Sequence, residues 1–470
     1  MRPEVTPADL LARLPPAVGW RVERVAAVAE RTGIDVYLVG GTVRDLLLGR
    51  ESLDVDLVVD GDGLVLAAAV ARELGGEVLE HAEFLTADVV DRDGFHLDIA
   101  TARAEIYEAP AALPRVRPAS LLEDLRRRDF TVNALAVRLG GGTRSRELID
   151  PCNGLTDLAA GALRVLHSGS FVDDPTRALR GVRLEQRLGF RFLPETESLI
   201  DGAVAAGAFA RLSGSRLLHE LQLLLGDPAA AAPAVERLAD LGLLAVLHPS
   251  LAESWNRAKR GGPAALGRSE AFGELLRGAL AQHARYRQGG LAEQPVRLWL
   301  LVLMAIAAEL DTAARAALAE RLLLAGEERR LLAGFAERLA GARPALEAAS
   351  LPHQADEALA ALAVEELLLL AAGEPAAGRA WVWRYLAELR SFRLAIRGAD
   401  LITAGVPAGP AVGRALASTR RARLDGEIGR HQELAFALGE LGLAPPEGGE
   451  PAAAAGAGGS RQEAGKEPAP

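Results

Sequence analysis

Every segment with the alternating pattern of a β-strand lies in the first 165 residues of the chain. Residues 36–39 form a short apolar run that ends in two glycines, and residues 53–59 alternate Asp with Leu and Val at period two. Residues 96–100 form another strand candidate, and the Ala-rich residues 64–74 read as a helix. Strands interleaved with helices predict a compact, sheet-containing domain in the first third of the chain.

No comparable strand pattern follows residue 163. Residues 174–188 and 213–225 carry apolar side chains at helical spacing, and the chain stays rich in Ala, Leu, Arg and Glu to about residue 445. We therefore predict an α+β fold class: a sheet-containing head followed by a long all-helical region. Residues 445–470, rich in Ala, Gly, Pro and Glu, are expected to be disordered.

Composition narrows the functional class. The net charge of −10 excludes a uniformly basic nucleic-acid coat, although residues 384–423 still carry eight basic side chains against two acidic ones. The apolar stretch 298–308 is shorter than the roughly 20 residues that span a bilayer, so it predicts a buried core helix. Residues 1–14 lack the layout of a signal peptide, and we expect a cytoplasmic protein with no membrane partner.

The most informative window runs from Gly40-Gly41 to the pair Asp54 and Asp56. In a strand, residues two apart point to the same face, so the two carboxylates would lie side by side. Such a pair repels unless a cation lies between its members, and hard oxygen ligands suit Mg²⁺. The glycines allow a ligand to approach the backbone, and Arg44 could contact the same anion.

Each of these features also has an ordinary structural interpretation. An isolated Asp-X-Asp is common on a solvated strand edge, and Gly-Gly is more often a turn. The conjunction of Gly40-Gly41, Arg44 and the two aspartates within one short window is much more specific. Asp45 is expected to be structural, either pairing with an arginine or capping backbone groups.

Four ordered motifs together resemble a known family. Residues 40–45 with Asp54-Val-Asp56 resemble motif A of the class II nucleotidyltransferases of the polymerase-beta superfamily, the CCA-adding enzymes and bacterial poly(A) polymerases. Residues 126–134, Arg-Arg-Arg-Asp-Phe-Thr-Val-Asn-Ala, resemble the second motif of that family. Residues 150–158 resemble its junction between head and neck, and residues 171–180 resemble its nucleotide-selecting neck helix.

The resemblance implies roles for the acidic side chains of the head. Asp54 and Asp56 are expected to hold two Mg²⁺ ions that activate the primer 3′-hydroxyl and neutralise the triphosphate. Asp98 is a candidate third catalytic carboxylate, with a structural pairing to Arg103 as the equal alternative.

The resemblance also implies a set of nucleotide contacts. In the head these are Gly40, Gly41, Arg44 and Arg128. Arg126 and Arg127 are expected to face solvent or RNA, and Asn133 is expected to be a structural hydrogen-bonding residue.

Base selection is assigned to the neck. Asp174 and Arg177 lie three residues apart, which places them on one face of a helix. A carboxylate accepts from the exocyclic amine of cytosine or adenine, and an arginine donates to the ring acceptors, so the pair could admit C and A. By resemblance these two residues select the nucleotide, with Arg180 and Arg183 nearby; Asp173 departs from the Glu found in many members. An ordinary amphipathic helix with exposed arginines is the alternative.

We predict a tRNA nucleotidyltransferase that adds or repairs the 3′-terminal CCA, with the tRNA 3′ end, CTP and ATP as partners and Mg²⁺ as cofactor. The alternatives are an enzyme that adds only A or only CC, a poly(A) polymerase, and a non-catalytic RNA-binding protein. The expected domains are an N-terminal helical extension (1–33), the head (34–163), a helical neck (164–230), a helical body (231–375), a tRNA-binding helical tail (376–444) and the disordered C-terminus (445–470).

Overall fold

A computed structural model describes residues 6–140, 146–260, 263–291 and 295–443, and the side chains of residues 257–272 are outside the description. The predicted disordered segment 445–470 lies outside the described residues. The chain forms two compact units, Met1–Ala340 with Leu362–Pro375, and Gly341–Ala361 with Ala376–Pro470. The finer division into head, neck and body stays a prediction.

The first unit begins with a seven-stranded mixed sheet whose strand order is β3-β4-β5-β2-β1-β8-β9. The central strands β2 and β5 are parallel, and the other neighbours pair antiparallel. The strand bounds are β1 Asp35–Val39, β2 Asp56–Asp60, β3 Glu77–His81, β4 Thr86–Val90, β5 His96–Thr101, β8 Ala136–Gly140 and β9 Leu148–Ile149.

The two faces of this sheet have different neighbours. Helices α2 (Pro16–Thr32) and α4 (Gly63–Leu74) pack on one face, and α5 (Leu121–Arg126) packs near the other. Val58 belongs to the buried cluster that includes Leu121 and Leu125 of α5. Asp56 lies two residues before Val58, and side chains two apart share a face, so Asp56 lies on the α5 side. The face without α2 and α4 is therefore the one that carries the predicted catalytic carboxylates.

Short elements complete the sheet-containing part. Strands β6 (Arg103–Ile106) and β7 (Arg115–Pro118) form a hairpin that follows β5 and precedes α5 in the sequence. The remaining elements are α1 (Pro7–Leu11), α3 (Gly41–Leu47), the 3-10 turns Ala82–Phe84 and Thr131–Asn133, and α6 (Gly154–Ala160). This order of strands and helices confirms the predicted α+β class.

Among the residues that the structure describes after residue 163, helices dominate, as predicted, and one short strand interrupts them. The two-residue strand β11 (Arg191–Phe192) pairs in parallel with β10 (Ala162–Leu163). The expectation that strands end at residue 163 is therefore wrong at this point, because a two-residue strand is too short to give an alternating pattern.

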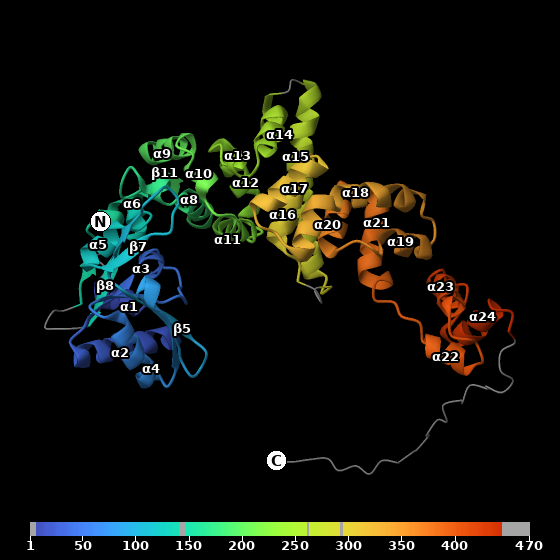
Figure 1. Cartoon of the computed structure of the whole chain (residues 1–470), viewed down its shortest axis with the longest axis horizontal. Helices are drawn as coiled ribbons and strands as arrows, with labels where there is room; N and C mark the ends of the chain where they lie inside the picture. Colours follow the sequence, from blue (N-terminus) through green and yellow to red (C-terminus); the bar gives the residue numbers. More distant parts are fainter. Residues whose placement is uncertain (1–5, 141–145, 261–262, 292–294, 444–470) are drawn as a thin grey trace, which may run out of the picture. The chain divides into compact units, whose positions relative to one another are not determined.

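The helices of the first unit follow one another with short connections (Figure 1). They are α7 Ser170–Asp173, α8 Thr176–Leu188, α9 Pro194–Ala205, α10 Ala208–Arg211, α11 Gly214–Leu225, α12 Ala231–Asp240, α13 Leu244–Leu247, α14 Pro249–Arg260, α15 Pro263–Gln288, α16 Leu298–Ile306, α17 Thr312–Arg321, α18 Gly326–Ala348, whose residues 341–348 belong to the second unit, and α20 Val364–Gly373.

Gly181 of helix α8 packs against a cluster of aromatic rings that lies outside this helix. The ring of Phe192 lies 6.0 Å from that of Phe130 and 6.2 Å from that of Phe171, measured between centroids. A Cβ atom on Gly181 of α8 would lie 2.2 Å from Cζ of Phe192, so only glycine allows this close approach. The contact brings α8, which carries Arg177 of the predicted base-selecting pair, against the segment that follows α5.

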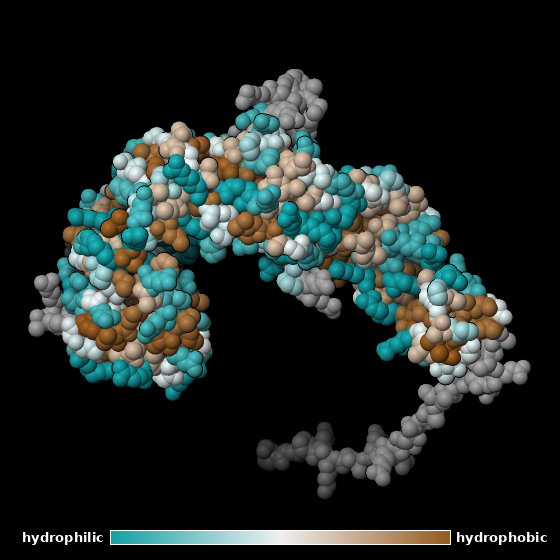
Figure 2. All heavy atoms as spheres, in the orientation of Figure 1, coloured by the Kyte–Doolittle hydropathy of each residue, from teal (hydrophilic) through white to brown (hydrophobic). Residues whose placement is uncertain are grey.

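The apolar stretch predicted to be a core helix forms α16, in which all nine residues are buried. Hydrophilic residues cover much of the helical surface on the face shown in Figure 2. Within the described parts of the chain, every helix is too short or too polar to cross a membrane.

The second unit is entirely helical where it is described. It contains α19 (Pro352–Leu359), α21 (Ala376–Arg384), the π-helical turn Tyr385–Leu389, α22 (Gly398–Thr403), α23 (Pro410–Leu424) and α24 (Glu433–Gly439). Leu401, Val412 and Leu438 are among the buried residues of its core. Arg420 of α23 forms two hydrogen bonds of 2.9 and 2.8 Å with the carboxylate of Asp356 in α19.

Candidate active site

Three predicted acidic residues meet at the centre of the sheet. Asp56 is the first residue of β2, and it pairs in register with Asp98 of β5. Asp54 precedes the strand, so the predicted strand 53–59 begins three residues later than expected. The main-chain carbonyl of Asp54 accepts a hydrogen bond of 2.9 Å from the hydroxyl of Thr42. This bond ties the aspartate pair to the helix that follows Gly40-Gly41.

The carboxylates of this cluster repel one another. Burial raises the pKa of Asp56, and nearby Asp54 raises it further, against the lowering effect of Arg128. Desolvation and the neighbouring carboxylates, Asp56 first among them, also raise the pKa of Asp98. A cation would relieve this repulsion, and carboxylate oxygens are the ligands that Mg²⁺ prefers.

The donor set thus fits a hard divalent cation. Among the described residues, no group of three or more His, Cys, Asp or Glu side chains is arranged to hold a metal ion. The three carboxylates are thus not arranged as a three-ligand metal site. Asp54 and Asp56 as metal ligands, and Asp98, opposite Asp56, as a third catalytic carboxylate, stay predictions. The alternative pairing of Asp98 with Arg103 is wrong, because Arg103 lies 3.6 Å from Glu105 and donates to the carbonyl of Phe84.

Gly40 has the backbone of a residue that only glycine adopts easily, with φ of 70°. A Cβ atom there would lie 2.8 Å from Nη1 of Arg128 and 3.8 Å from Oδ2 of Asp56. Arg128 donates from Nη2 to Asp124 at 3.0 Å. Burial alone would raise the pKa of Asp124, but Arg128 and Arg127 hold it below its usual value. Gly40 therefore makes room for a fixed cationic side chain beside the carboxylates.

Arg44 is buried beneath this turn. Its guanidinium donates to Asp45 at 2.9 Å through Nε and to the side-chain oxygen of Asn133 at 2.5 Å through Nη1. Asp45 also accepts from Arg187 of α8 at 2.8 Å, which agrees with its expected structural pairing. Asn133 donates onward to Asp129 at 2.8 Å, as expected of a structural hydrogen-bonding residue. The predicted phosphate contact of Arg44 stays a prediction.

Asp174 lies between two helices rather than within one. It follows α7 with an extended backbone (φ −136°, ψ 94°), and α8 begins at Thr176. The expectation that Asp174 and Arg177 share one helix face is wrong, because the residue before a proline is disfavoured in the helical region and Pro175 follows Asp174. The two residues nevertheless line the same cavity.

The carboxylate of Asp174 is held through one oxygen. Oδ1 accepts from the main-chain N–H of Thr176 at 3.0 Å, from its hydroxyl at 2.6 Å and from Arg216 at 2.6 Å. Oδ2 has no hydrogen-bond partner among the residues that the structure describes. The side chain is thus fixed in place while one acceptor oxygen stays available.

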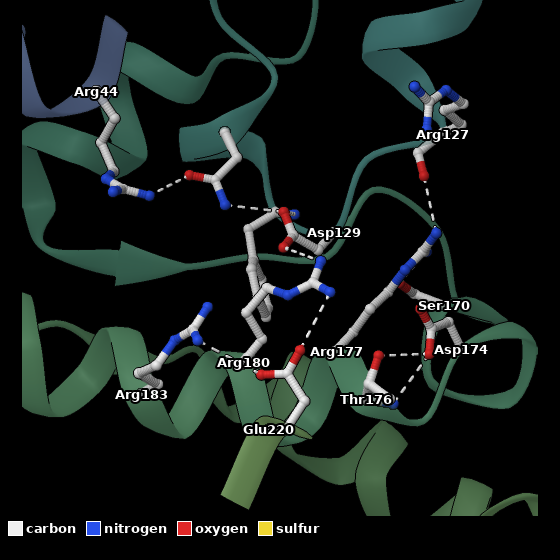
Figure 3. A network of polar contacts seen from close by, with 12 residues as sticks. Arg44, Arg127, Asp129, Ser170, Asp174, Thr176, Arg177, Arg180, Arg183 and Glu220 are labelled. Atoms are coloured by element: carbon white, nitrogen blue, oxygen red, sulfur yellow. Dashed lines mark hydrogen bonds and ion pairs between the residues drawn. The ribbon is translucent and has the colours of Figure 1, made fainter. Parts of the chain in front are cut away.

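Arg177 is also fixed. It is buried, and it donates from Nη1 to the hydroxyl of Ser170 and from Nη2 to the main-chain carbonyl of Arg127, both at 2.8 Å (Figure 3). Each bond uses one of the five N–H groups of a guanidinium, so the side chain retains donors for a ligand.

Arg180 and Arg183 share an acidic partner on α11. Arg180 contacts Asp129 at 3.1 Å and Glu220 at 3.3 Å, and Arg183 lies 3.7 Å from the other oxygen of Glu220. Burial lowers the pKa of Arg180, but the two carboxylates outweigh it and leave the pKa above its usual value. Arg180 is therefore held as a cation at the site, with its side chain 35% exposed.

One cavity of about 370 Å³ brings most of the predicted nucleotide-binding residues together. Gly40, Gly41, Arg128, Asp174, Arg177 and Arg180 line it. Arg44 and Arg183 lie outside its lining. A second cavity of about 300 Å³ is lined by Asp56, Asp98 and Asp88, and Arg127 and Arg128 line both cavities. Arg127 and Arg128 thus form a wall that the two cavities share. Asp56 and Asp98 line the cavity on one side of this wall, and Asp174 and Arg177 line the cavity on the other side.

Several lining residues were not predicted from the sequence, among them Glu105, Tyr107 and Arg216. Tyr107 donates to Glu105 at 2.8 Å, and burial and Glu105 raise the pKa of its hydroxyl. The expectation for Arg127 is wrong, since it binds Asp124 and Glu105 instead of facing solvent or RNA. The triplet of arginines carries no signal that separates the exposed Arg126 from the paired Arg127.

Comparison with known proteins places this site in a family. Residues 36–164 match the family described as the poly A polymerase head domain. An A-adding tRNA nucleotidyltransferase of Geobacter sulfurreducens is 37% identical over 87% of this chain and 46% of its own length. Another from Halalkalibacterium halodurans is 42% identical over 46% of this chain and 52% of its own. The chain spans about half the length of these curated relatives.

Solved structures match nearly the whole chain. A CCA-adding enzyme in its apo form II is 30% identical, with a TM-score of 0.76, over 92% of this chain and 97% of that one. The Thermotoga maritima CCA-adding enzyme complexed with tRNA is 27% identical, with a TM-score of 0.72, over 93% and 98%. Other matched structures of CCA-adding enzymes hold CTP or ATP.

Proposed function

This chain belongs to the class II tRNA nucleotidyltransferase and poly(A) polymerase head family, and we propose that it adds nucleotides to the 3′ end of tRNA. The observation that carries the proposal is the shared wall between the two cavities. Asp56 and Asp98 line one side of it, and Asp174 and Arg177 line the other. A nucleoside triphosphate could place its phosphates near the carboxylates and its base near the neck residues.

At the phosphate end, Asp54 and Asp56 would hold Mg²⁺, which supplies charge neutralisation for the triphosphate and lowers the pKa of the attacking hydroxyl. Arg128 contributes a fixed cation beside Asp56, because Asp124 orients its guanidinium and Gly40 leaves space for it. Arg180 is a second cation that lines the same cavity, held by Asp129 and Glu220.

At the base end, the available oxygen of Asp174 can accept from the exocyclic amine of adenine or cytosine. Arg177 can donate to a ring nitrogen or carbonyl of the same base. Guanine and uracil present a carbonyl where this carboxylate needs a donor, so both would be rejected. The fixed positions of Asp174 and Arg177 suit such a selection without a nucleic-acid template.

We propose addition of the terminal A from ATP as the specific activity. The curated relatives named above, one of them 37% identical over 87% of this chain, are A-adding enzymes, and they support this alternative better than complete CCA addition. Complete CCA addition from CTP and ATP is the second candidate, which the matched structures of CCA-adding enzymes favour.

The test uses three tRNA transcripts that end at the discriminator base, after the first C and after the second C. Each is incubated with Mg²⁺ and labelled CTP, ATP or both. Single A addition to the longest transcript alone is the expected result, and CCA addition to the shortest would establish the second candidate. Addition of CC alone or of long A tails would contradict both. No incorporation would leave a non-catalytic RNA-binding protein, which tRNA binding would then reveal.

A further inference from the structure

We propose that Arg216 is a positioning residue that links the loop between β6 and β7 to the carboxylate of Asp174, and thereby sets nucleotide selectivity. This inference rests on the proposed function, because it concerns how the same cavity distinguishes bases. It adds a contribution from α11, an element that lies far in sequence from every residue predicted to read the base.

The guanidinium of Arg216 forms hydrogen bonds with two partners. Arg216 donates from Nη2 to Oδ1 of Asp174 at 2.6 Å and from Nη1 to the main-chain carbonyl of Ala111 at 3.1 Å. Its side chain is 25% exposed, so both bonds form in a largely desolvated setting. Arginine offers a planar fork of donors, whereas lysine offers a single ammonium group at the end of a flexible chain. The bridge therefore depends on the shape of the side chain as well as on its charge.

Ala111, whose carbonyl accepts from Arg216, is also bound through its N–H. The N–H of Ala111 donates to the carbonyls of Val172 and Asp173, each at 3.2 Å. Ala111 has φ of 61°, in the left-handed region that alanine rarely adopts. The loop is thus fastened to the segment before Asp174 by its N–H and to Arg216 by its carbonyl. Tyr107 and Pro114 of this loop line the cavity.

The bridge determines what Asp174 presents to a ligand. Thr176 and Arg216 occupy Oδ1, and this leaves Oδ2 as the acceptor (Figure 3 shows the Thr176 bonds). A carboxylate with one oxygen fixed offers a single acceptor in one direction, which favours an exocyclic amine over a carbonyl. Loss of Arg216 would leave Oδ1 of Asp174 held by Thr176 alone, and would remove the link from the carbonyl of Ala111 to that carboxylate.

The experiment compares the full chain with Arg216→Ala and Arg216→Lys. The matched control is Arg211→Ala, which removes an exposed arginine five residues earlier. The values of kcat/KM for ATP, CTP, GTP and UTP are measured with the tRNA transcript that the unchanged protein extends. Thermal melting of each variant checks folding, and Arg216→Lys serves where Arg216→Ala fails to fold.

We expect Arg216→Ala to lower the preference for the correct base by about 10- to 100-fold, as loss of a charge-assisted hydrogen bond would. Arg216→Lys should recover part of that preference, and Arg211→Ala should leave it unchanged. A uniform loss of kcat/KM for all four nucleotides, or no loss, would overturn the proposal, because a purely structural arginine would not alter the ratio between bases.

A second measurement separates this inference from the proposed function. Hydrogen exchange at the Ala111 amide and its loop, 107–114, requires no catalysis. Faster exchange in Arg216→Ala than in Arg211→Ala would support the link even if the unchanged protein extended no tRNA. Equal exchange in the two variants would overturn the link even if tRNA were extended.

Discussion

At the scale of single residues, the site depends on side chains whose polar atoms are only partly committed to the protein. Asp174 gives one oxygen to Thr176 and Arg216 and keeps the other available. Arg177 uses two donors on Ser170 and the carbonyl of Arg127 and retains others. Such residues are fixed by the fold before a nucleotide arrives, so little ordering is needed when it binds.

The first prediction concerns Asp174 itself. We expect Asp174→Ala to reduce the preference for the correct base over GTP and UTP by about tenfold or more, while catalysis continues. The neighbouring Asp173→Ala is the control, because Asp173 lies 3.9 Å from His167 and makes no contact with Thr176 or Arg216. Relative incorporation of the four nucleotides measures the effect, and unchanged selectivity would remove the assigned role.

The second prediction concerns pH. Because the pKa of Asp98 is raised in the folded protein, the folded state binds its proton more tightly than the unfolded state. The free energy of unfolding therefore falls as pH rises through the range between those two pKa values. We expect Asp98→Asn to unfold at a higher temperature than the unchanged chain at neutral pH, with the difference vanishing at a pH below the unfolded pKa. Melting curves from pH 3 to 8 measure this, and an unchanged gap across that range would count against it.

At the scale of elements, the sequence patterns predicted which segments form strands and helices better than they predicted where each ends. The strands β1, β2 and β5, the helix α4 and the buried α16 follow from local patterns. Asp174 was misplaced into a helix because the effect of Pro175 outweighs helical spacing there. Glu105, Tyr107 and Arg216 could not be found in this way, because the cavity joins a hairpin loop to a distant helix and no local pattern encodes that contact.

The third prediction tests the packing of α8. We expect Gly181→Ala to lower the free energy of unfolding by about 1–3 kcal/mol, because the added Cβ would lie 2.2 Å from Phe192 and 2.9 Å from Phe130. Gly202→Ala in α9 is the matched control, since nothing lies within 4 Å of its added Cβ. In that exposed helix alanine should stabilise by about 0.5–1 kcal/mol. Denaturant titration measures both, and equal effects of the two substitutions would contradict this packing.

At the scale of the whole molecule, two compact units divide the chain. The candidate active site lies wholly within the first unit. The second has its own buried core and its own ion pairs, including Arg420 with Asp356 and Arg423 with Glu433. Because the net charge is −10, an RNA partner would have to bind through local basic surfaces. Such binding depends on contacts between basic side chains and phosphates, so tRNA binding should weaken as the salt concentration rises.

The fourth prediction follows from this division. Arg420 donates to Asp356 and to the carbonyls of Leu389 and Phe392, all in the second unit. We expect Arg420→Ala to destabilise that unit by about 1.5–3 kcal/mol and to leave the first unit unchanged. Calorimetry should then show one unfolding transition moving while another stays, whereas Gly181→Ala should move the other. A single transition that shifts as one in both variants would contradict the independence of the units.

The most direct test of the account replaces both proposed metal ligands, Asp54→Ala with Asp56→Ala, and measures nucleotide addition and tRNA binding on the same preparation. The unchanged chain should extend a tRNA 3′ end in the presence of Mg²⁺. The double variant should lose that activity by at least about a thousandfold, because the transferred phosphates lose their charge neutralisation. Its tRNA affinity should remain close to that of the unchanged chain. Continued nucleotide addition by the double variant would contradict the assignment of this site.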